Sequence, residues 1–159
     1  MRILYCLDGT NSEQISRAQA IVSHSEALAV GVLYVIDSGP REDIARSRQR
    51  FLRTPVPMRE DEMRRTEAGT SREILNEGAR YLPGAEIMER QGHPEREIVN
   101  CAAEWRADLV VVCARAEYGA MPGIGPKSVG HVARFVLDHA PCPVLLLRRS
   151  GQEHFPISK

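Results

Sequence analysis

Five short apolar runs, separated by segments with helical spacing, constrain the fold of this sequence more than any other feature. The clearest run spans residues 107–113 and contains the string Leu-Val-Val-Val, without alternation of polar and apolar residues. Such a run is typical of a strand that is buried on both faces, as in a parallel sheet. The runs at residues 3–7, 28–36, 85–89 and 144–147 are expected to form four more strands.

Helices are expected between these strands, at residues 11–24, 60–82, 94–105 and 127–139. Thr10 and Glu13 have the spacing of a capping box, which predicts that Thr10 caps the first helix. Strands that alternate with helices indicate an α/β fold, in which a doubly wound sheet carries helices on both faces. We therefore expect five mainly parallel strands.

Ligands of doubly wound sheets bind beyond the carboxyl ends of the strands, at the switch point. This rule places Asp8, Asp37, Gly92 and the loop 113–131 around one crevice. Asp8 is expected to belong to the site rather than only to form a turn before glycine. For Asp37 the functional and the structural interpretation both stay open.

Composition and charge argue against several classes of protein. Lys plus Arg equals Asp plus Glu, at 21 each, so no basic excess favours a nucleic-acid partner. The sequence contains no apolar run of about 18 residues that could span a membrane. Its N-terminus also lacks the apolar region of a signal peptide. We therefore expect a cytoplasmic protein without a membrane partner.

The four cysteines form no CxxC pair and no metal-ligand cluster with histidine. Cys6 and Cys113 stand at the ends of apolar runs, where we expect buried thiols that pack as small hydrophobic groups. This usage fits a reducing compartment.

Residues 1–148 are expected to form a single domain, followed by a polar, loose tail at 149–159. Within this domain, residues 38–60 form a long insertion that is rich in arginine. A solvated charged face is the first interpretation of these arginines, and binding of phosphate or an acidic partner is the alternative. They are Arg41, Arg46, Arg48, Arg50 and Arg53.

Five motifs, in the right order along the chain, resemble those of the universal stress protein family. They are the strand and acidic turn at 3–10, the strand end Tyr-Val-Ile-Asp at 34–37, the Gly-His-Pro turn at 92–94, the strand at 107–112 and the closing segment at 139–147. The resemblance covers nearly the whole chain except residues 38–60 and the tail.

The resemblance implies a Rossmann-like fold, a homodimer paired through the last strand (142–148), and a stress-linked regulatory role. It also implies an adenine nucleotide, ATP or AMP, in the crevice at the carboxyl ends of the strands, with Mg²⁺ as a metal near Asp8. The residues that would line this site are Asp8, Val35, Cys113, Ala114, Lys127, Ser128, Gly130, His131 and Val132.

The loop after the fourth strand departs from the glycine-rich pattern of nucleotide-binding family members. Ala114 and Glu117 stand where the paired glycines would fall. The family pattern ends with a glycine that is followed by a hydroxyl residue. In one alignment Lys127-Ser128 stand at these two positions, and in another alignment Gly130-His131 stand there. Adenosine binding is compatible with both registers, whereas the triphosphate cradle matches neither fully.

Residues 119–131 offer a second kind of phosphate site, because Lys127 and Ser128 place an ammonium and a hydroxyl at an expected helix start. The alternative of equal weight is a plain loop in which Ser128 is the N-cap. A P-loop is excluded, because Pro126 stands where that motif requires glycine directly before lysine.

Three histidines and the tryptophan complete the candidates. His131 is expected either to contact phosphate or take part in acid–base chemistry, or to lie on a helix surface. His139 is expected at a helix C-terminus, His93 at an N-cap or turn, and Trp105 in the core.

Three functions remain open from the sequence. The first is a universal-stress-protein-like regulator that binds an adenine nucleotide. The second is a dimeric regulator that acts through protein partners without a nucleotide. The third is a slow ATP hydrolase. No Ser-His-Asp or Cys-His arrangement can be placed from spacing, so an enzyme is not the favoured interpretation.

Overall fold

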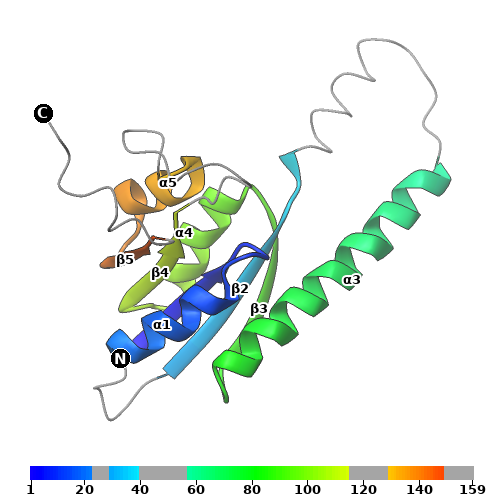
Figure 1. Cartoon of the computed structure of the whole chain (residues 1–159). Coiled ribbons are helices and arrows are strands. Elements are labelled where there is room, and N and C mark those ends of the chain that lie inside the picture. Colours follow the sequence, from blue (N-terminus) through cyan, green and yellow to red (C-terminus); the bar gives the residue numbers. More distant parts are fainter. Residues whose placement is uncertain (23–28, 40–56, 115–128, 149–159) are drawn as a thin grey trace, which may run out of the picture.

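The computed structural model describes residues 1–22, 29–39, 57–114 and 129–148. Figure 1 shows a central sheet with helices packed against it. In chain order the elements are β1 (Arg2–Leu7), α1 (Ser12–Val22), β2 (Ala29–Asp37), α3 (Pro57–Tyr81), β3 (Glu86–Gly92), α4 (Pro94–Glu104), β4 (Leu109–Cys113), α5 (His131–His139) and β5 (Val144–Leu147).

All five strands pair in parallel, in the order β3-β2-β1-β4-β5. The first strand lies at the centre, where Tyr5 pairs with Val32 of β2 on one side and with Val111 of β4 on the other. A helix lies between each strand and the next in the sequence, as parallel pairing requires. The predicted doubly wound α/β fold is confirmed, and the sheet is parallel throughout.

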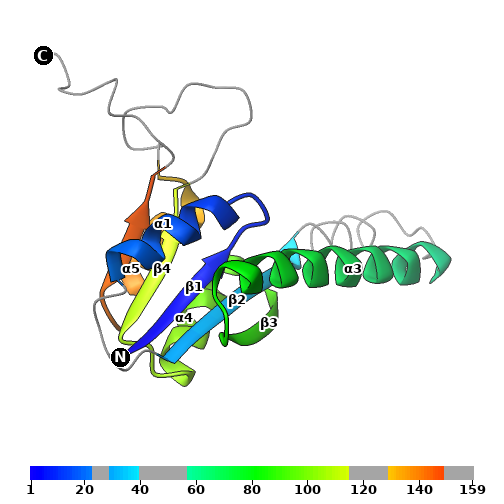
Figure 2. The same cartoon turned by 60° about the horizontal axis from the view of Figure 1, so that its bottom comes forward.

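Helices cover both faces of the sheet, with α1 and α3 on one face and α4 and α5 on the other (Figures 1 and 2). Successive residues of a strand point to opposite faces. In β1, Leu4 and Cys6 pack towards α4 and α5, whereas Ile3, Tyr5 and Leu7 pack towards α1 and α3. All five side chains are buried, which explains why this strand shows no polar alternation.

The second half of α3 packs against the sheet. Ser71, Leu75 and Gly78 are buried, whereas residues 68–70 are exposed. Figure 1 shows the first half of this helix extending beyond the edge of the sheet. A Cβ atom at Gly78 would lie 2.6 Å from Cδ1 of Leu7, so glycine is what allows α3 to approach β1 this closely.

Two predicted helix starts are wrong. The first helix begins at Ser12, so Asn11 rather than Thr10 precedes it, and the Thr10 hydroxyl donates to Oδ1 of Asp8 instead. The last helix begins at His131 and not at residue 127. Its N-cap is Gly130, so the predicted capping role of Ser128 is wrong as well.

The remaining differences are small. The third strand continues to Gly92, further than the predicted end at residue 89. Helix α3 begins at Pro57, inside the predicted insertion 38–60. Residues 40–56 of this insertion lie outside the described part of the chain. Within the described ranges, no helix has the length and apolar character needed to cross a membrane.

Candidate functional site

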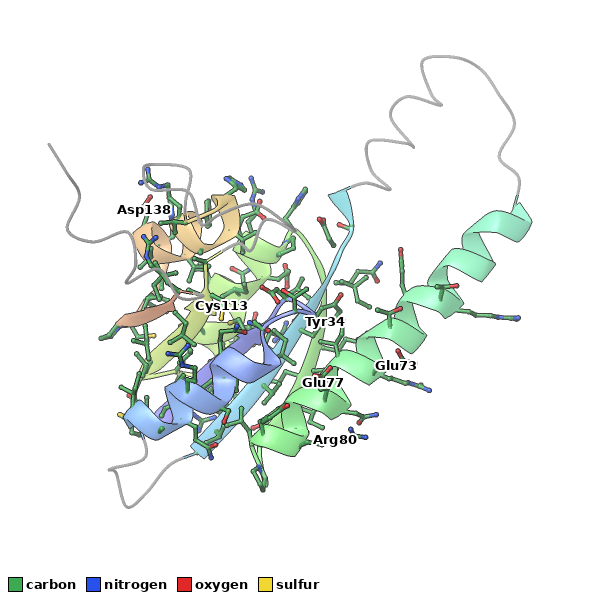
Figure 3. The ribbon with its side chains drawn as sticks, in the orientation of Figure 1. Tyr34, Glu73, Glu77, Arg80, Cys113 and Asp138 are labelled. Carbon is green, nitrogen blue, oxygen red and sulfur yellow. The ribbon has the colours of Figure 1, made fainter. Side chains whose placement is uncertain are left out.

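The order of the strands defines where a ligand can enter. From β1 the chain proceeds outwards to β2 and β3, and then returns to β4 on the opposite side of β1. The switch point therefore lies between the carboxyl ends of β1 and β4, where ligands of such sheets bind. Asp8 directly follows β1, and Ala114 directly follows β4. Figure 3 labels Cys113, the last residue of β4.

The turn after β1 holds the Asp8 carboxylate at this edge. Its Oδ1 accepts hydrogen bonds from the backbone N–H of Thr10, at 2.8 Å, and from the Thr10 hydroxyl, at 3.0 Å. The backbone N–H of Asp8 donates to Oδ1 of the buried Asn11. Asp8 remains exposed. It is therefore both a turn-former and a charged group that faces solvent at the switch point.

Helix α5 begins at the same edge of the sheet. Gly130, its N-cap, has a φ of 83°, a conformation that favours glycine. Because glycine has no side chain, it cannot cap the first N–H groups of the helix, and these are the groups that bind anions at helix N-termini. The first residue, His131, is 77% exposed at its side chain, and its Nε2 lies 3.7 Å from Oε1 of Glu95.

The other predicted residues are apolar and differ in burial. Val35 is buried in the core between the sheet and α4, and Ala114 is buried next to the end of β4. Cys113 and Val132 are partly exposed. Lys127 and Ser128 lie outside the described residues, so this part of the predicted site has no structural account.

Three of the four thiols have raised pKa values. Burial, reinforced by the other three cysteines, raises the pKa of Cys6 well above the ordinary range. Burial also raises the pKa values of Cys101 and Cys142. All four cysteines are free thiols. The prediction of a buried thiol is confirmed for Cys6, whereas Cys113 is only partly buried.

The described residues contain no group of three or more histidine, cysteine, aspartate or glutamate side chains that could hold a metal ion. Asp8 alone cannot form a site for Mg²⁺. That ion is usually held by one or two carboxylates together with substrate phosphates. The exposed carboxylate of Asp8 could therefore serve only as one ligand of several.

A pocket of about 180 Å³ lies between β2 and α3, on the face of the sheet that α1 and α3 cover. Figure 3 shows Tyr34 on this side. Burial raises the pKa of Tyr34, and the carboxylates of Asp8, Asp37 and Glu89 raise it further. The lining residues are Tyr34, Ile36, Asp37, Thr66, Glu67 and Thr70. Our sequence reasoning missed this pocket, although the four-residue spacing of Thr66 and Thr70 places both hydroxyls on one helix face.

The single-residue predictions have clear outcomes. Trp105 is buried, and its Nε1 donates to Oε2 of Glu86 at 2.8 Å, so it belongs to the core. His93 is the N-cap of α4, and His139 is the last residue of α5, where its Nδ1 lies 2.9 Å from the carbonyl oxygen of Phe135. Asp37 accepts the N–H of Gly39 at 2.8 Å and also lines the β2–α3 pocket, so both interpretations of it remain.

The parallel five-stranded sheet, with its switch point between β1 and β4, defines a doubly wound α/β protein. Comparison with known families makes the assignment narrower, because the model of the universal stress protein family matches residues 1–148. The chain belongs to this family. A search of proteins with curated descriptions found no match.

Solved structures with a similar fold include several universal stress proteins. The protein UspA from Lactobacillus plantarum is 20% identical, with a TM-score of 0.66 over 93% of this chain and 97% of that one. A family member from Arabidopsis thaliana, solved with AMP bound, is 17% identical, with a TM-score of 0.59 over 99% and 97% of the two chains. A universal stress protein in complex with cAMP is 22% identical, with a TM-score of 0.52 over 94% and 98%. At these identities the likeness establishes the fold.

Proposed function

We propose that this protein is a cytoplasmic stress regulator that binds an adenine nucleotide, AMP or ATP, between the carboxyl ends of β1 and β4. The observation that carries the proposal is the start of α5 at this edge, where the N-cap is Gly130 with a φ of 83°. A helix start without a capping side chain presents N–H groups to a phosphate. The bound AMP and cAMP of two family members with this fold support the same ligand class.

Each predicted residue has a role in this proposal. Asp8 and Val35 border the adenosine, and Cys113 and Ala114 form the wall at the end of β4. The backbone N–H groups of the 130–132 segment bind the phosphate. Lys127 and Ser128, which are not among the described residues, would add an ammonium and a hydroxyl. A Mg²⁺ ion, when bound, would be held in part by the Asp8 carboxylate and would neutralise phosphate charge.

Thermal melting of the purified protein tests this function. We expect AMP or ATP, but not GMP, to raise the melting temperature, because a ligand that binds only the native state stabilises it by about 2.7 kcal/mol at a hundred times its Kd. Mass analysis of the denatured supernatant reports any nucleotide that co-purifies. No shift at millimolar nucleotide and no released nucleotide would overturn the proposal.

Two matched variants locate the site. In the presence of Mg²⁺, Asp8→Asn should weaken the nucleotide-dependent shift, because it removes the carboxylate that would help to hold the ion beside the phosphate. Asp37→Asn is the control, since Asp37 is the last residue of a strand and also accepts a turn N–H, but lines the β2–α3 pocket. If Asp8→Asn and Asp37→Asn reduce the nucleotide-dependent shift equally, the ligand does not bind specifically beside Asp8.

We further propose that residues 1–148 form one domain and that two copies pair through β5. The four residues of β5, Val144–Leu147, are apolar and only half-buried, whereas the other edge strand, β3, carries Glu86, Glu89 and Arg90. Charged edges discourage strand pairing and apolar edges permit it. Light scattering should therefore report a dimer that Leu145→Lys converts to a monomer and that Ile87→Lys, on β3, leaves intact. A monomeric wild-type protein would contradict this.

A further inference from the structure

The carboxylate of Glu95 lies where two helices begin. Glu95 belongs to the first turn of α4, and its side chain is only 15% exposed. Its Oε1 is 3.7 Å from Nε2 of His131, the first residue of α5. The two helices pack on the same face of the sheet and both start at its carboxyl edge (Figures 1 and 2).

This position is one that an anion would favour. The N-terminus of a helix carries a partial positive charge, so a carboxylate in its first turn is stabilised. In the proposed function, the same partial positive charge at the start of α5 attracts the phosphate. The carboxylate of Glu95 is therefore already present beside the start of α5, 3.7 Å from the imidazole of its first residue, His131. A bound phosphate has to share His131 with this carboxylate.

The second acid of that turn is placed differently. Glu97 lies against Gly92, where its Cγ would be 2.9 Å from a Cβ atom on the glycine. It is thus directed towards the end of β3, whereas Glu95 is directed towards α5. The two residues have the same charge, the same helix turn and different neighbours, so one serves as the control for the other.

We propose that Glu95 determines which adenine nucleotide the site accepts, by repelling phosphate groups in proportion to their charge. The proposal rests on the proposed nucleotide-binding function. At neutral pH a cyclic phosphodiester carries about one negative charge, a monophosphate about two and a triphosphate about four. A mostly buried carboxylate is weakly screened by salt, so its repulsion acts on each added charge. The site therefore favours AMP or a cyclic monophosphate over ATP.

Isothermal titration calorimetry with cAMP, AMP and ATP tests this proposal on the wild-type protein, Glu95→Gln and Glu97→Gln. Glutamine keeps the shape of the side chain and removes its charge. We expect Glu95→Gln to tighten ATP binding about tenfold, AMP binding about threefold and cAMP binding by less than about twofold. Glu97→Gln should change all three by less than about twofold. Circular dichroism and melting curves verify that each variant is folded.

The outcomes separate this inference from the function on which it rests. If the wild-type protein binds nucleotide and Glu95→Gln changes all three affinities by the same factor, or by none, Glu95 does not select by charge. A merely structural role predicts that uniform change. If Glu97→Gln also tightens binding most for ATP and least for cAMP, the selection comes from the overall negative potential of the protein, and the assignment to Glu95 is wrong. If no protein binds any of the three ligands, the nucleotide function itself is overturned, and the inference with it.

Discussion

The amide nitrogen of Asn11, Nδ2, donates a 2.9 Å hydrogen bond to the carbonyl oxygen of Cys6, inside β1. The amide oxygen of the same side chain accepts the backbone N–H of Asp8. Asn11 is only 2% exposed, so both bonds are shielded from water. The position of the Asp8 carboxylate at the switch point thus depends on one buried amide at the start of α1.

Replacing Asn11 by alanine should lower the free energy of unfolding by about 1–3 kcal/mol, because buried backbone groups lose their partners. Urea unfolding measures the difference. The control is Asn100→Ala on the exposed side of α4, which should change stability by no more than about 0.5 kcal/mol. Equal effects of the two substitutions would show that the Asn11 bonds contribute nothing.

Two glycines of α3 should respond oppositely to alanine. Gly78→Ala places a methyl group 2.6 Å from Cδ1 of the buried Leu7 and should destabilise by about 1–3 kcal/mol before the gain in helix propensity is subtracted. A Cβ at Gly69 meets nothing within 4 Å, so Gly69→Ala should stabilise by up to about 1 kcal/mol. Thermal unfolding compares the two. A stabilising Gly78→Ala would mean that α3 does not pack this closely.

The buried thiols should be slow to react in the native protein. A thiolate is the reactive form, and the raised pKa values of Cys6 and Cys101 reduce its fraction at pH 8. Alkylation followed by peptide mass mapping should therefore label both residues much more slowly in buffer than in urea. Rapid labelling of Cys6 in buffer would contradict its burial.

Stability should fall in alkaline solution. The folded-state pKa of Cys6 lies above the ordinary thiol value of 9.0, so the unfolded state loses its proton first as the pH rises. The stabilisation is complete below about pH 9 and is lost above it, at up to about 1.4 kcal/mol per pH unit. Urea unfolding at pH 8 and pH 10 measures the loss, which should be smaller in Cys6→Ala. A stability that rises over this interval would contradict the assignment.

The sheet could be predicted because its central strands, β1 and β4, are buried on both faces. A run such as residues 109–112 is typical of a central parallel strand, and helical spacing between the runs indicates the alternation of strands and helices. The crevice at the carboxyl ends of the strands followed from the same pattern, whereas the strand order came only from the structure. The family motifs also pointed to Asp8 and Gly130, which the structure places at the carboxyl edge.

The helix starts were harder to predict, because a side chain that could cap a helix can bond to another nearby group instead. Thr10 and Glu13 have capping-box spacing, but the Thr10 hydroxyl bonds to Asp8, and the helix begins one residue after Asn11. At α5 the N-cap is Gly130, with a φ of 83°, a helix start that no spacing of apolar residues indicates. The contact between Glu95 and His131 joins residues far apart in sequence and needed the packing of α4 on α5.

The central claim is that an adenine nucleotide binds at the switch point, and an NMR titration of ¹⁵N-labelled protein with AMP tests it most directly. The account predicts that the amide signals of Asp8, Gly130 and His131 shift in a saturable manner, while those of Ile36 and Thr70 in the β2–α3 pocket do not. Shifts confined to Ile36 and Thr70, or no shift at saturating AMP, would contradict it.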